Sequence, residues 1–324
     1  MGASSTFQSF LEWGLSKYPA DKTGVVLWNH GGAMMGVCYD EKKNDDSLTN
    51  SEVNKALSNA FKRVGRTEKL EWIGYDACLM QVQDIAEKNS EYFNYMIAAQ
   101  ESEAGEGWEY NTWIDDVYAK KDTNTILKAI CDGFISSYQN TYGKQGYDND
   151  QTLSYLDLSK MANYKTKFES LATAVKVEAT ASTLRAMAKN VKDYGTTYYS
   201  SKQELQQAGY GLNPGDEYYY GKYGIVYENG YYVDHGYNFF GTFDVVDFLN
   251  KLSSTYSSLN TKINETKTAL NELVVYNKVG AQAGNSNGLC LYFPLHTMCD
   301  KATNYASSET NFTNWRTVVN SFGA

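Results

Sequence analysis

The sequence predicts an α/β protein built around a layered sheet. Short apolar runs with the composition of strands alternate along the first half with segments whose apolar residues recur at helical spacing. Such alternation is typical of a mainly parallel sheet with helices packed on it. The predicted elements are, in order, helix Phe7 to Leu15, strand Val25 to Trp28, helix Ser51 to Val64, strand Leu70 to Tyr75, helix Met80 to Lys88, strand Tyr95 to Ala99, helix Thr125 to Tyr138 and strand Thr152 to Leu158.

The helix between the first two strands has the clearest signals. Asn50 or Ser51 can cap its first turn, and Gly65 follows its last residue. Its apolar residues fall on one face, namely Val53, Ala56, Leu57, Ala60 and Phe61. Such a helix can carry the chain from one strand to a parallel neighbour, so we expect the first two strands to lie side by side.

The second half is predicted to be mainly helical and peripheral to the sheet. Helical spacing runs from Met161 to Lys192 with a break at Ala179 to Ser182, and the Tyr- and Gly-rich stretch from Tyr194 to Phe243 has an irregular or β-like pattern. Helices around Val245 to Leu259 and Ile263 to Leu273 precede a strand from Leu289 to Phe293, which we expect to return to the sheet. The predicted divisions are a core in residues 1–160, a peripheral helical and Tyr-rich subdomain in residues 161–272, and a C-terminal segment returning to the core sheet in residues 273–324.

Charge and composition exclude several kinds of partner. The net charge of −9 argues against nucleic acid and anionic membranes and favours cationic ligands. No apolar run approaches the length of a membrane span. The five cysteines form neither a CxxC pair nor a zinc spacing, and the three histidines include no metalloprotease pair, so we expect no metal. The 28 tyrosines, with abundant Asn, Ser and Gly, are typical of a secreted or surface-exposed protein.

The main candidates for chemistry are His30 and Cys78, each at the end of a predicted strand. His30 follows Val25 to Trp28 in a loop with Gly31, and Cys78 stands between the strand that ends at Tyr75 and the next predicted helix. A thiol at a helix N-terminus has a lowered pKa, because the positive end of the helix dipole stabilises the thiolate. We therefore expect Cys78 to be a nucleophile and His30 to be its acid-base partner.

The spacing strengthens this interpretation. The separation of 48 residues (78 minus 30) is close to the roughly 50 residues by which the catalytic histidine precedes the cysteine in caspases. Taken alone, His30 could cap a strand and Cys78 could be a small buried residue. A rival histidine, His235, follows the aromatic run Tyr231 to Val233, but it comes after the cysteine and lies beside turn residues. The third histidine, His296, is predicted to lie in a surface loop. Order and spacing together favour the pair His30 and Cys78.

At these residues the chain resembles the clostripain-like cysteine peptidases, of the clan that also contains caspases, gingipains and legumains. The resemblance is carried by His30-Gly31, by Asp76-Ala77-Cys78, by Tyr18 to Asp21, by Ala99 to Tyr110 and by Gly288 to Pro294. It implies a caspase-like layered α/β/α sandwich, an oxyanion hole formed by the backbone amides of Gly31 and Cys78, and a secreted or bacterial cell-surface endopeptidase. Members of the family usually have another strand or two upstream of the segment that opens here at Met1.

The specificity pocket is predicted to be acidic. Asp76 lies two residues before Cys78 at a strand end, so its side chain returns to the same face as the thiol. The resemblance implies the same, because clostripain-like enzymes cleave after Arg or Lys and have an acid at this position. Glu106 matches a second family acid, often Asp, and Trp108 is a candidate wall of the pocket. Glu101 and Glu103 are expected to be structural.

A charged segment from Asp40 to Asp46 separates the two candidate residues. By its composition it is a solvated connector. An enzyme that cuts after basic residues would find Lys42 and Lys43 close to its own site, and the resemblance implies self-cleavage in this interval. The product would be a self-cleaved two-chain form, the alternative being an intact monomer. The flanking acids suggest calcium as an alternative role, although they lack the spacing of a dedicated calcium loop.

These observations favour a cysteine endopeptidase that cleaves after Arg or Lys in peptide or protein substrates, with no required cofactor. Two alternatives remain open at this point. The first is a peptidase of the same fold with another specificity, such as Asn or Asp, which an acidic pocket disfavours. The second is a non-catalytic surface binding module that uses the Tyr-rich region from Tyr194 to Phe243.

Overall fold

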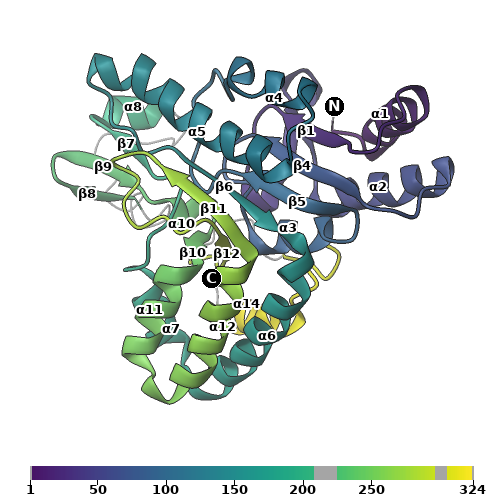
Figure 1. Ribbon diagram of the computed structural model, residues 1–324. Coiled ribbons are helices and arrows are strands. Elements are labelled where there is room, and N and C mark those ends of the chain that lie inside the picture. Colours follow the sequence, from purple (N-terminus) through teal and green to yellow (C-terminus); the bar gives the residue numbers. More distant parts are fainter. Residues whose placement is uncertain (1, 208–224, 296–304, 323–324) are drawn as a thin grey trace.

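The computed structural model describes residues 2–207, 225–295 and 305–322, and its centre is a five-stranded sheet (Figure 1). In spatial order the strands are β1 (Gly24–Trp28), β4 (Leu70–Asp76), β5 (Phe93–Ala98), β6 (Thr152–Asp157) and β11 (Val274–Val279). The pairs β1–β4 and β4–β5 are parallel, whereas β6 is antiparallel to both β5 and β11. Four of the five strands therefore point the same way, which confirms the mainly parallel sheet expected from the sequence.

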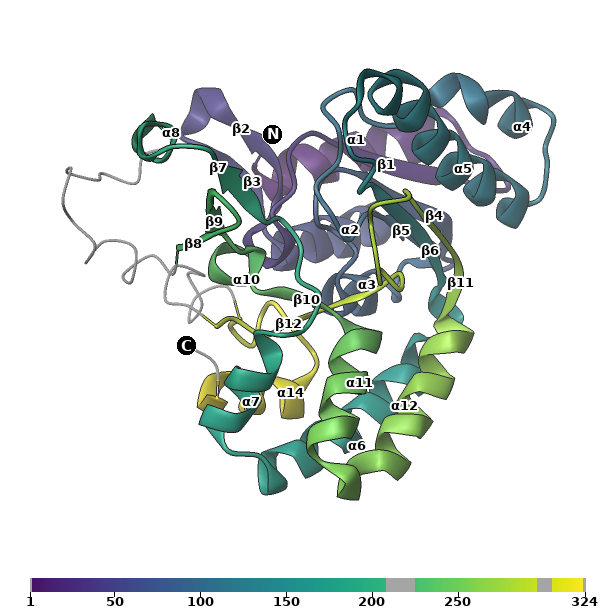
Figure 2. The same ribbon diagram turned by 90° about the vertical axis from the view of Figure 1, so that its left-hand side faces the viewer.

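Side chains on the strands alternate between two apolar layers. In β4, Ile73 and Tyr75 belong to one layer and Trp72 to the other, and Met96 and Ile97 of β5 divide in the same way. The first layer packs against α1 (Ser4–Lys17), α2 (Asn50–Val64) and α3 (Gln83–Asn89), and the second against α5 (Thr123–Thr141). Figure 2 shows α4 (Ile114–Tyr118) beside α5 on that second side. Helices thus cover both faces, as the α/β/α prediction requires.

The helix α2 is the connection that places β1 beside β4. Its N-cap is Thr49, whose hydroxyl accepts a hydrogen bond from Glu52 N–H while the Glu52 carboxylate accepts one from Thr49 N–H. The expected caps Asn50 and Ser51 are instead the first residues of the helix, so that prediction was wrong by one position. At the other end Gly65 adopts a left-handed conformation, φ 68°, which glycine tolerates at a helix C-terminus.

The second half of the chain adds helices to one side of the sheet. Both views show α6 (Met161–Glu178), α7 (Ala181–Ala188), α11 (Val245–Thr255), α12 (Asn260–Leu273) and α14 (Thr313–Phe322) gathered below the sheet (Figures 1 and 2). The helix break expected at Ala179 to Ser182 lies between α6 and α7. Phe168, Leu249 and Trp315 from these helices belong to the same buried cluster as the first face of the sheet. The subdomain boundaries at residues 160 and 272 stay a prediction.

The Tyr-rich stretch forms a small antiparallel sheet in its described part. It consists of β7 (Thr197–Tyr199), β9 (Tyr231–Asp234) and β8 (Val226–Glu228), in that spatial order. Along the chain β7 precedes α8 (Lys202–Gln207), and β8 and β9 precede α10 (Gly236–Phe239). The β-like pattern predicted for Tyr194 to Phe243 is therefore confirmed where the structure describes it.

One prediction about strands was wrong, and one strand of the main sheet was not predicted. The segment from Leu289 to Phe293 contains β12 (Cys290–Tyr292), which pairs with β10 (Thr242–Asp244) in a separate two-stranded sheet and does not join the five-stranded one. The chain returns to the main sheet through β11, which follows α12 without a turn. No Gly, Pro or Asn cluster marks this boundary, and the half-exposed edge strand lacks a clear apolar pattern, so β11 could not be predicted from the sequence.

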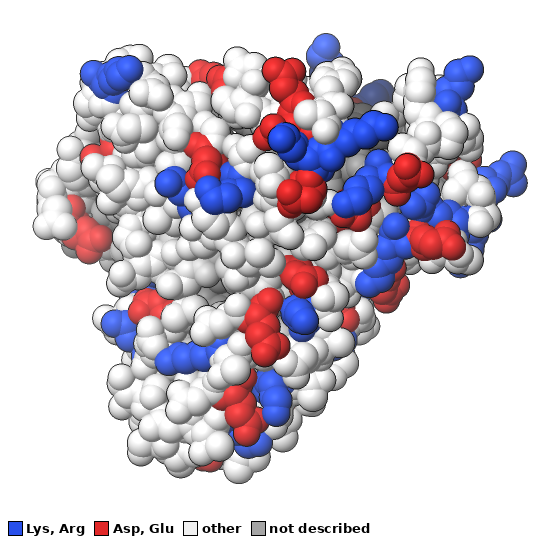
Figure 3. Space-filling model, in the orientation of Figure 1, with Lys and Arg blue, Asp and Glu red and all other residues white. Residues whose placement is uncertain are grey.

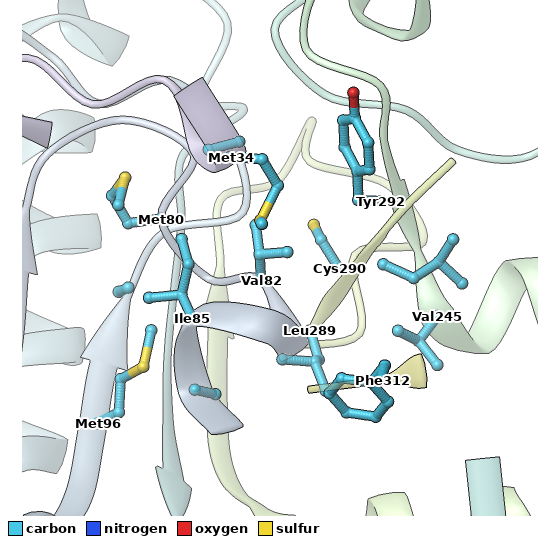
Figure 4. Packing of buried hydrophobic residues seen from close by; sticks show 14 of the residues in the cluster. Met34, Met80, Val82, Ile85, Met96, Val245, Leu289, Cys290, Tyr292 and Phe312 are labelled. Atoms are coloured by element: carbon cyan, nitrogen blue, oxygen red, sulfur yellow. The ribbon is translucent and has the colours of Figure 1, made fainter. Parts of the chain in front are cut away.

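β12 nevertheless supports the segment that follows β4. Cys290 N–H donates to the Gln81 carbonyl at 2.8 Å, and Val82 forms an isolated parallel bridge with Cys290. Figure 4 shows Val82 and Ile85 of this segment among Met34, Met96 and Leu289 in the buried cluster. The loop after β4 is thus fixed from the side of β12 as well as from the sheet.

Candidate active site

The register of β1 and β4 brings the two candidate residues together. Trp28 pairs with Asp76 as the last register pair of these parallel strands, and Asn29 N–H donates to the Asp76 carbonyl at 3.4 Å. His30 and Cys78 each follow that pair by two residues. Two neighbouring strand ends therefore deliver both side chains to one edge of the sheet, as the sequence pattern predicted.

A pocket of about 240 Å³ opens at this edge. His30 is exposed and Cys78 is half-buried in its wall. The lining residues come from the ends of β1 and β4 and from the loop after β5: Trp28, Asn29, His30, Asp76, Ala77, Cys78, Glu103, Ala104, Gly105 and Gly107. Three of the predicted site residues, His30, Cys78 and Asp76, therefore share one cavity.

The backbone on either side of the candidate pair is unusual. Asn29, just before His30, has φ 135°, and Leu79, just after Cys78, has φ 68°. Non-glycine residues avoid positive φ, and a leucine there costs on the order of 1 kcal/mol or more. Leu79 is held by its N–H, which donates to the Glu101 carbonyl at 3.2 Å. Strain of this kind gathers at functional sites, because the surrounding structure must enforce it.

Gly31 lies directly against the backbone of Cys78. A Cβ at Gly31 would lie 2.2 Å from the Cys78 carbonyl oxygen and 3.1 Å from its nitrogen, so only glycine fits. Gly31 also forms an isolated antiparallel bridge with Val37. The two hydrogen bonds of this bridge are made by the neighbouring residues, since Gly32 N–H donates to the Gly36 carbonyl and Cys38 N–H donates to the His30 carbonyl. The bridge therefore leaves the Gly31 N–H unused, close to the Cys78 amide.

The thiol of Cys78 is not where the helix-dipole argument placed it. Helix α3 begins only at Gln83, and residues 80–82 run on as a non-helical segment, with Gln81 N–H donating to the Ala99 carbonyl at 2.9 Å. Burial raises the pKa of the Cys78 thiol, and the nearby acids Glu103 and Glu101 add to the rise. The expectation of a thiol pKa lowered by a helix N-terminus was therefore wrong. Two backbone N–H groups act to lower this pKa, namely that of Glu103, which donates to Cys78 Sγ at 3.2 Å, and that of Cys78 itself.

Asp76 is the acid that forms the floor of the pocket. Its carboxylate accepts from Trp108 N–H at 3.0 Å and from the Tyr110 hydroxyl at 3.0 Å, and the residue is only 2% exposed. Gly107 leaves the necessary space, since a Cβ there would lie 2.6 Å from Asp76 Oδ1. Burial raises the pKa of Asp76, although these two donors act to lower it.

Glu103 is a pocket residue that sequence reasoning took for a structural one. Its carboxyl group is buried, accepts from Trp108 Nε1–H at 3.3 Å and is in hydrogen-bonding contact with Asp76. Burial and the Asp76 charge together raise the pKa of Glu103 well above its usual range. The sequence signal was present in the segment Ala99 to Tyr110, but the strand-end argument used for Asp76 does not extend to a residue on a loop.

The structure does not place the other two predicted pocket residues in the lining. Trp108 is 3% exposed and packs beneath the pocket, where its ring lies against Gly74, so that it holds Asp76 and Glu103 without lining the cavity. Glu106 is exposed and accepts a hydrogen bond from the Tyr142 hydroxyl just beyond α5. Direct contact between Glu106 and a substrate side chain in this pocket would require that hydrogen bond to open.

Lys42 and Lys43 lie at the tip of a hairpin between the two candidate residues. The hairpin pairs β2 (Val37–Asp40) with β3 (Asp46–Leu48) through a turn of 3₁₀ helix at Glu41–Lys43, and both lysines are exposed. The Asp40 carboxylate accepts a hydrogen bond from Lys42 N–H at 3.2 Å, so this acid is bonded within its own charged segment. Within residues 2–207, 225–295 and 305–322, no group of three or more His, Cys, Asp or Glu side chains is placed to hold a metal ion, so nothing there supports the calcium suggestion.

The rival histidine belongs to the Tyr-rich sheet. His235 follows β9 and lies between Glu228, at 3.3 Å, and Asp193, at 4.0 Å, with its ring stacked on Tyr237. It is not among the residues that line the Cys78 pocket. His296 lies outside the described residues.

The fold is that of the C11 cysteine proteases. It matches an inactive zymogen C11 protease from Parabacteroides distasonis with a TM-score of 0.63 at 16% identity, over 96% of this chain and 75% of that one. A secreted C11 cysteine protease from Bacteroides thetaiotaomicron gives a TM-score of 0.62 at 15% identity, over 97% and 77%. The chain belongs to the clostripain family, whose sequence model matches residues 1–314. The resemblance stated from the motifs is thereby confirmed.

A curated relative sets the scale of the match. The chain is 22% identical over 336 residues to clostripain from Hathewaya histolytica. The alignment covers 91% of this chain and 57% of clostripain, so the chain spans little more than half the length of that relative.

Proposed function

We propose that this protein is a cysteine endopeptidase that cleaves peptide bonds after Arg or Lys. The observation that supports it most is the strand register. The pair Trp28 and Asp76 ends two adjacent parallel strands, and His30, Cys78 and the Asp76 carboxylate then meet in one pocket. Membership of the clostripain family and the name of the curated relative favour the same chemistry.

In this mechanism Cys78 Sγ attacks the carbonyl carbon of the scissile bond. His30 takes the thiol proton and then gives it to the leaving amine, and water hydrolyses the resulting thioester. Since burial raises the pKa of the Cys78 thiol, the resting thiol is protonated and needs His30 as a base when substrate binds. We expect the N–H groups of Gly31 and Cys78, two residues whose backbones are in contact, to donate jointly to the oxyanion. Such donors are commonly worth roughly 3 to 4 kcal/mol each in the transition state.

Specificity follows from the acids at the pocket floor. A basic side chain entering from the substrate would meet Asp76, whose carboxylate is already oriented by Trp108 and Tyr110. Within the described residues no Lys or Arg side chain forms an ion pair with Asp76 or Glu103, so the cation that balances this pocket has to come from the ligand.

The surface and sequence are compatible with a peptide substrate. Figure 3 shows Lys and Arg interspersed with Asp and Glu on the face drawn, without one broad basic area. In the described part of the chain, no helix combines the length and apolarity that a bilayer crossing requires. We propose secretion or bacterial surface exposure on the basis of composition and of the secreted B. thetaiotaomicron neighbour.

The test is hydrolysis of four peptide reporters that differ only in the residue before the scissile bond: Arg, Lys, Asn or Asp. We expect the Arg and Lys reporters to be cleaved, and Cys78→Ala to abolish cleavage of both while its circular dichroism stays that of the wild type. Cleavage after Asn or Asp would favour the alternative specificity. Absence of Cys78-dependent cleavage in all four would favour a non-catalytic module.

A further inference from the structure

Two carboxyl groups are in contact in this pocket. Their contact costs free energy while the cavity holds no cation, because two like charges repel each other. Asp76 ends β4, whereas Glu103 lies on the loop after β5, and the two side chains meet in the pocket wall. Both residues line the cavity together with Cys78. Two buried carboxylates cannot both stay ionised at hydrogen-bonding distance, so one proton lies between them.

The partners of the two groups decide which one keeps that proton. Asp76 accepts two hydrogen bonds, from Trp108 N–H and from the Tyr110 hydroxyl, and both favour its anion. Apart from its contact with Asp76, Glu103 accepts one long hydrogen bond, 3.3 Å from Trp108 Nε1, and no N–H or O–H of the described residues donates to its buried Oε2. Glu103 is therefore the protonated member and Asp76 the charged one.

In the part of the chain that the structure describes, no Lys or Arg side chain forms an ion pair with either carboxyl group. The titratable groups that face the pair are the Tyr110 hydroxyl, the Cys78 thiol beside Glu103, and His30 across the same cavity. Glu101, the next acid on the loop, instead accepts hydrogen bonds from Ser102 N–H and Gly195 N–H, each at 2.8 Å.

We propose that Glu103 is a second cation-binding residue of this pocket, which shares one proton with Asp76 while the pocket is empty and releases it to solvent when a basic side chain binds. This inference rests on the proposed function. The pair carries a net charge of −1 when empty and −2 when a substrate guanidinium or ammonium is present, so binding replaces a shared proton by a cation. Affinity for a basic side chain then rises with pH, whereas affinity for a neutral isostere does not.

The experiment uses the full chain as the Cys78→Ala variant, so that nothing is cleaved. Calorimetry measures the binding of a tetrapeptide amide ending in Arg, in two buffers with different heats of ionisation. The difference between the two heats gives the number of protons released. We expect release of up to about one proton per bound Arg peptide, and none for the same peptide ending in citrulline.

The decisive comparison adds Glu103→Gln to that background. The amide retains the size of the side chain and the bond from Trp108 but cannot hold the shared proton. We expect proton release to disappear and affinity for the Arg peptide to fall about 10-fold or more. Glu109→Gln is the matched control on the same loop, since the Glu109 carboxylate accepts from Ser137 on α5 and does not line the pocket; it should release protons as the parent does.

The outcomes separate this inference from the proposed function. If the parent variant prefers the Arg peptide to the citrulline peptide but releases no proton, or if Glu103→Gln releases as many, the shared proton is refuted while the function stands. If the parent shows no preference for Arg, the proposed specificity fails and the inference with it. Should Glu103→Gln not fold, the wild-type ratio of kcat/KM for Arg over citrulline reporters decides, because a ratio that does not rise with pH refutes the proposal.

Discussion

At the scale of single residues, the site depends on backbone geometry as much as on side-chain chemistry. Asn29 and Leu79 hold positive φ on either side of the candidate pair, and Gly31 allows the two strand-end loops to touch. A side chain at Gly31 would separate His30 from Cys78 by pushing on the Cys78 carbonyl. These contacts explain why two loops of otherwise ordinary composition can hold the candidate nucleophile and the candidate base together.

Cys78→Ala and His30→Ala should both abolish hydrolysis. In the proposed mechanism the Cys78 thiol attacks the substrate, and because burial raises its pKa, that mechanism needs a base. We expect kcat/KM for an Arg reporter to fall by roughly 10³-fold or more in each variant, and the double variant to lose little more, because residues that act as a unit are not additive. His235→Ala is the control and should leave activity unchanged. A loss of activity in His235→Ala with retention in His30→Ala would contradict the assignment.

Asp76→Asn should weaken binding of the basic side chain much more than it destabilises the fold. The amide keeps one acceptor for Trp108 or Tyr110 but loses the charge, and a charge-assisted hydrogen bond is worth up to about 3 kcal/mol. We expect kcat/KM to fall about 100-fold on Arg and Lys reporters and far less on a neutral one, with a smaller change in the urea midpoint. An equal fall on charged and neutral reporters would mean that Asp76 is only structural.

Sequence reasoning reached His30, Cys78 and Asp76 because each follows from strand periodicity and strand ends. It did not assign Glu103, because a loop has no period that tells which side chain turns inward. Glu106 and Trp108 were proposed from the same loop, yet the structure ties one to Tyr142 and puts the other beneath the cavity. The residues predicted from strand periodicity lie together in one pocket, whereas the two predicted by position along the loop are not in its lining.

At the scale of elements, α3 connects the loop after β4 to the C-terminal part of the chain. Asp84 on α3 is fully buried and accepts hydrogen bonds from the hydroxyls of Tyr305 and Thr310. Nearby, the Asn50 amide donates to the Glu309 carbonyl at 2.9 Å. The segment from Tyr305 to Thr310 is thereby fastened to α2 and α3 behind the candidate site.

Asp84 should make the stability of the protein depend on pH. Burial raises the pKa of Asp84 from 3.8 to about 6. Between these values the native state keeps a proton that the unfolded chain has released, so the contribution of Asp84 to the free energy of unfolding decreases as pH rises, by about 3 kcal/mol in all. Asp84→Asn has no such dependence. The free energy of unfolding of Asp84→Asn, measured by urea at pH 4 and pH 7 relative to wild type, should rise by about that amount. A pH-independent difference would contradict the buried charge.

The β2–β3 hairpin is the element in which we predict self-processing. Its tip exposes Lys42 and Lys43, and such tips are where proteolytic nicks concentrate. A cut after Lys43 would give fragments of 43 and 281 residues, since 324 minus 43 is 281. They should stay associated, because β1 pairs with β4 and α1 packs on α2 across the cut.

Intact-mass measurement of wild type and Cys78→Ala after identical purification tests this prediction. We expect the nick in wild type and its absence from Cys78→Ala and from a Lys42→Ala, Lys43→Ala double variant. A nick in Cys78→Ala would assign the cut to another protease. If the lysine variant is uncut but still active, cleavage does not control the site.

The elements that sequence analysis misplaced have a common cause. The boundary between α12 and β11 has no turn residue, and β12 is an apolar run whose partner strand, β10, was not predicted. An apolar strand pattern indicates burial but not a pairing partner. The α/β alternation of residues 1–160, where each strand pairs with the next along the chain, was predictable because connections there are local.

At the scale of the whole molecule, the helices of the second half and one face of the sheet share a single buried cluster. Disturbance of the C-terminal segment can therefore reach the loop after β4 through Cys290 and Gln81. The five-stranded sheet determines where the ends of β1 and β4 lie, and the helices of the second half pack against one face of that sheet.

One measurement can test both parts of the proposal, namely that Cys78 is the nucleophile and that a basic residue before the scissile bond binds in the acidic pocket. A peptidyl chloromethyl ketone ending in Arg is incubated with the protein beside its citrulline counterpart, and the adduct is located by intact mass and peptide mapping. The account predicts one equivalent added at Cys78, at a much higher rate for Arg than for citrulline, and none in Cys78→Ala. Equal rates for the two reagents, or an adduct on any residue other than Cys78, would contradict it.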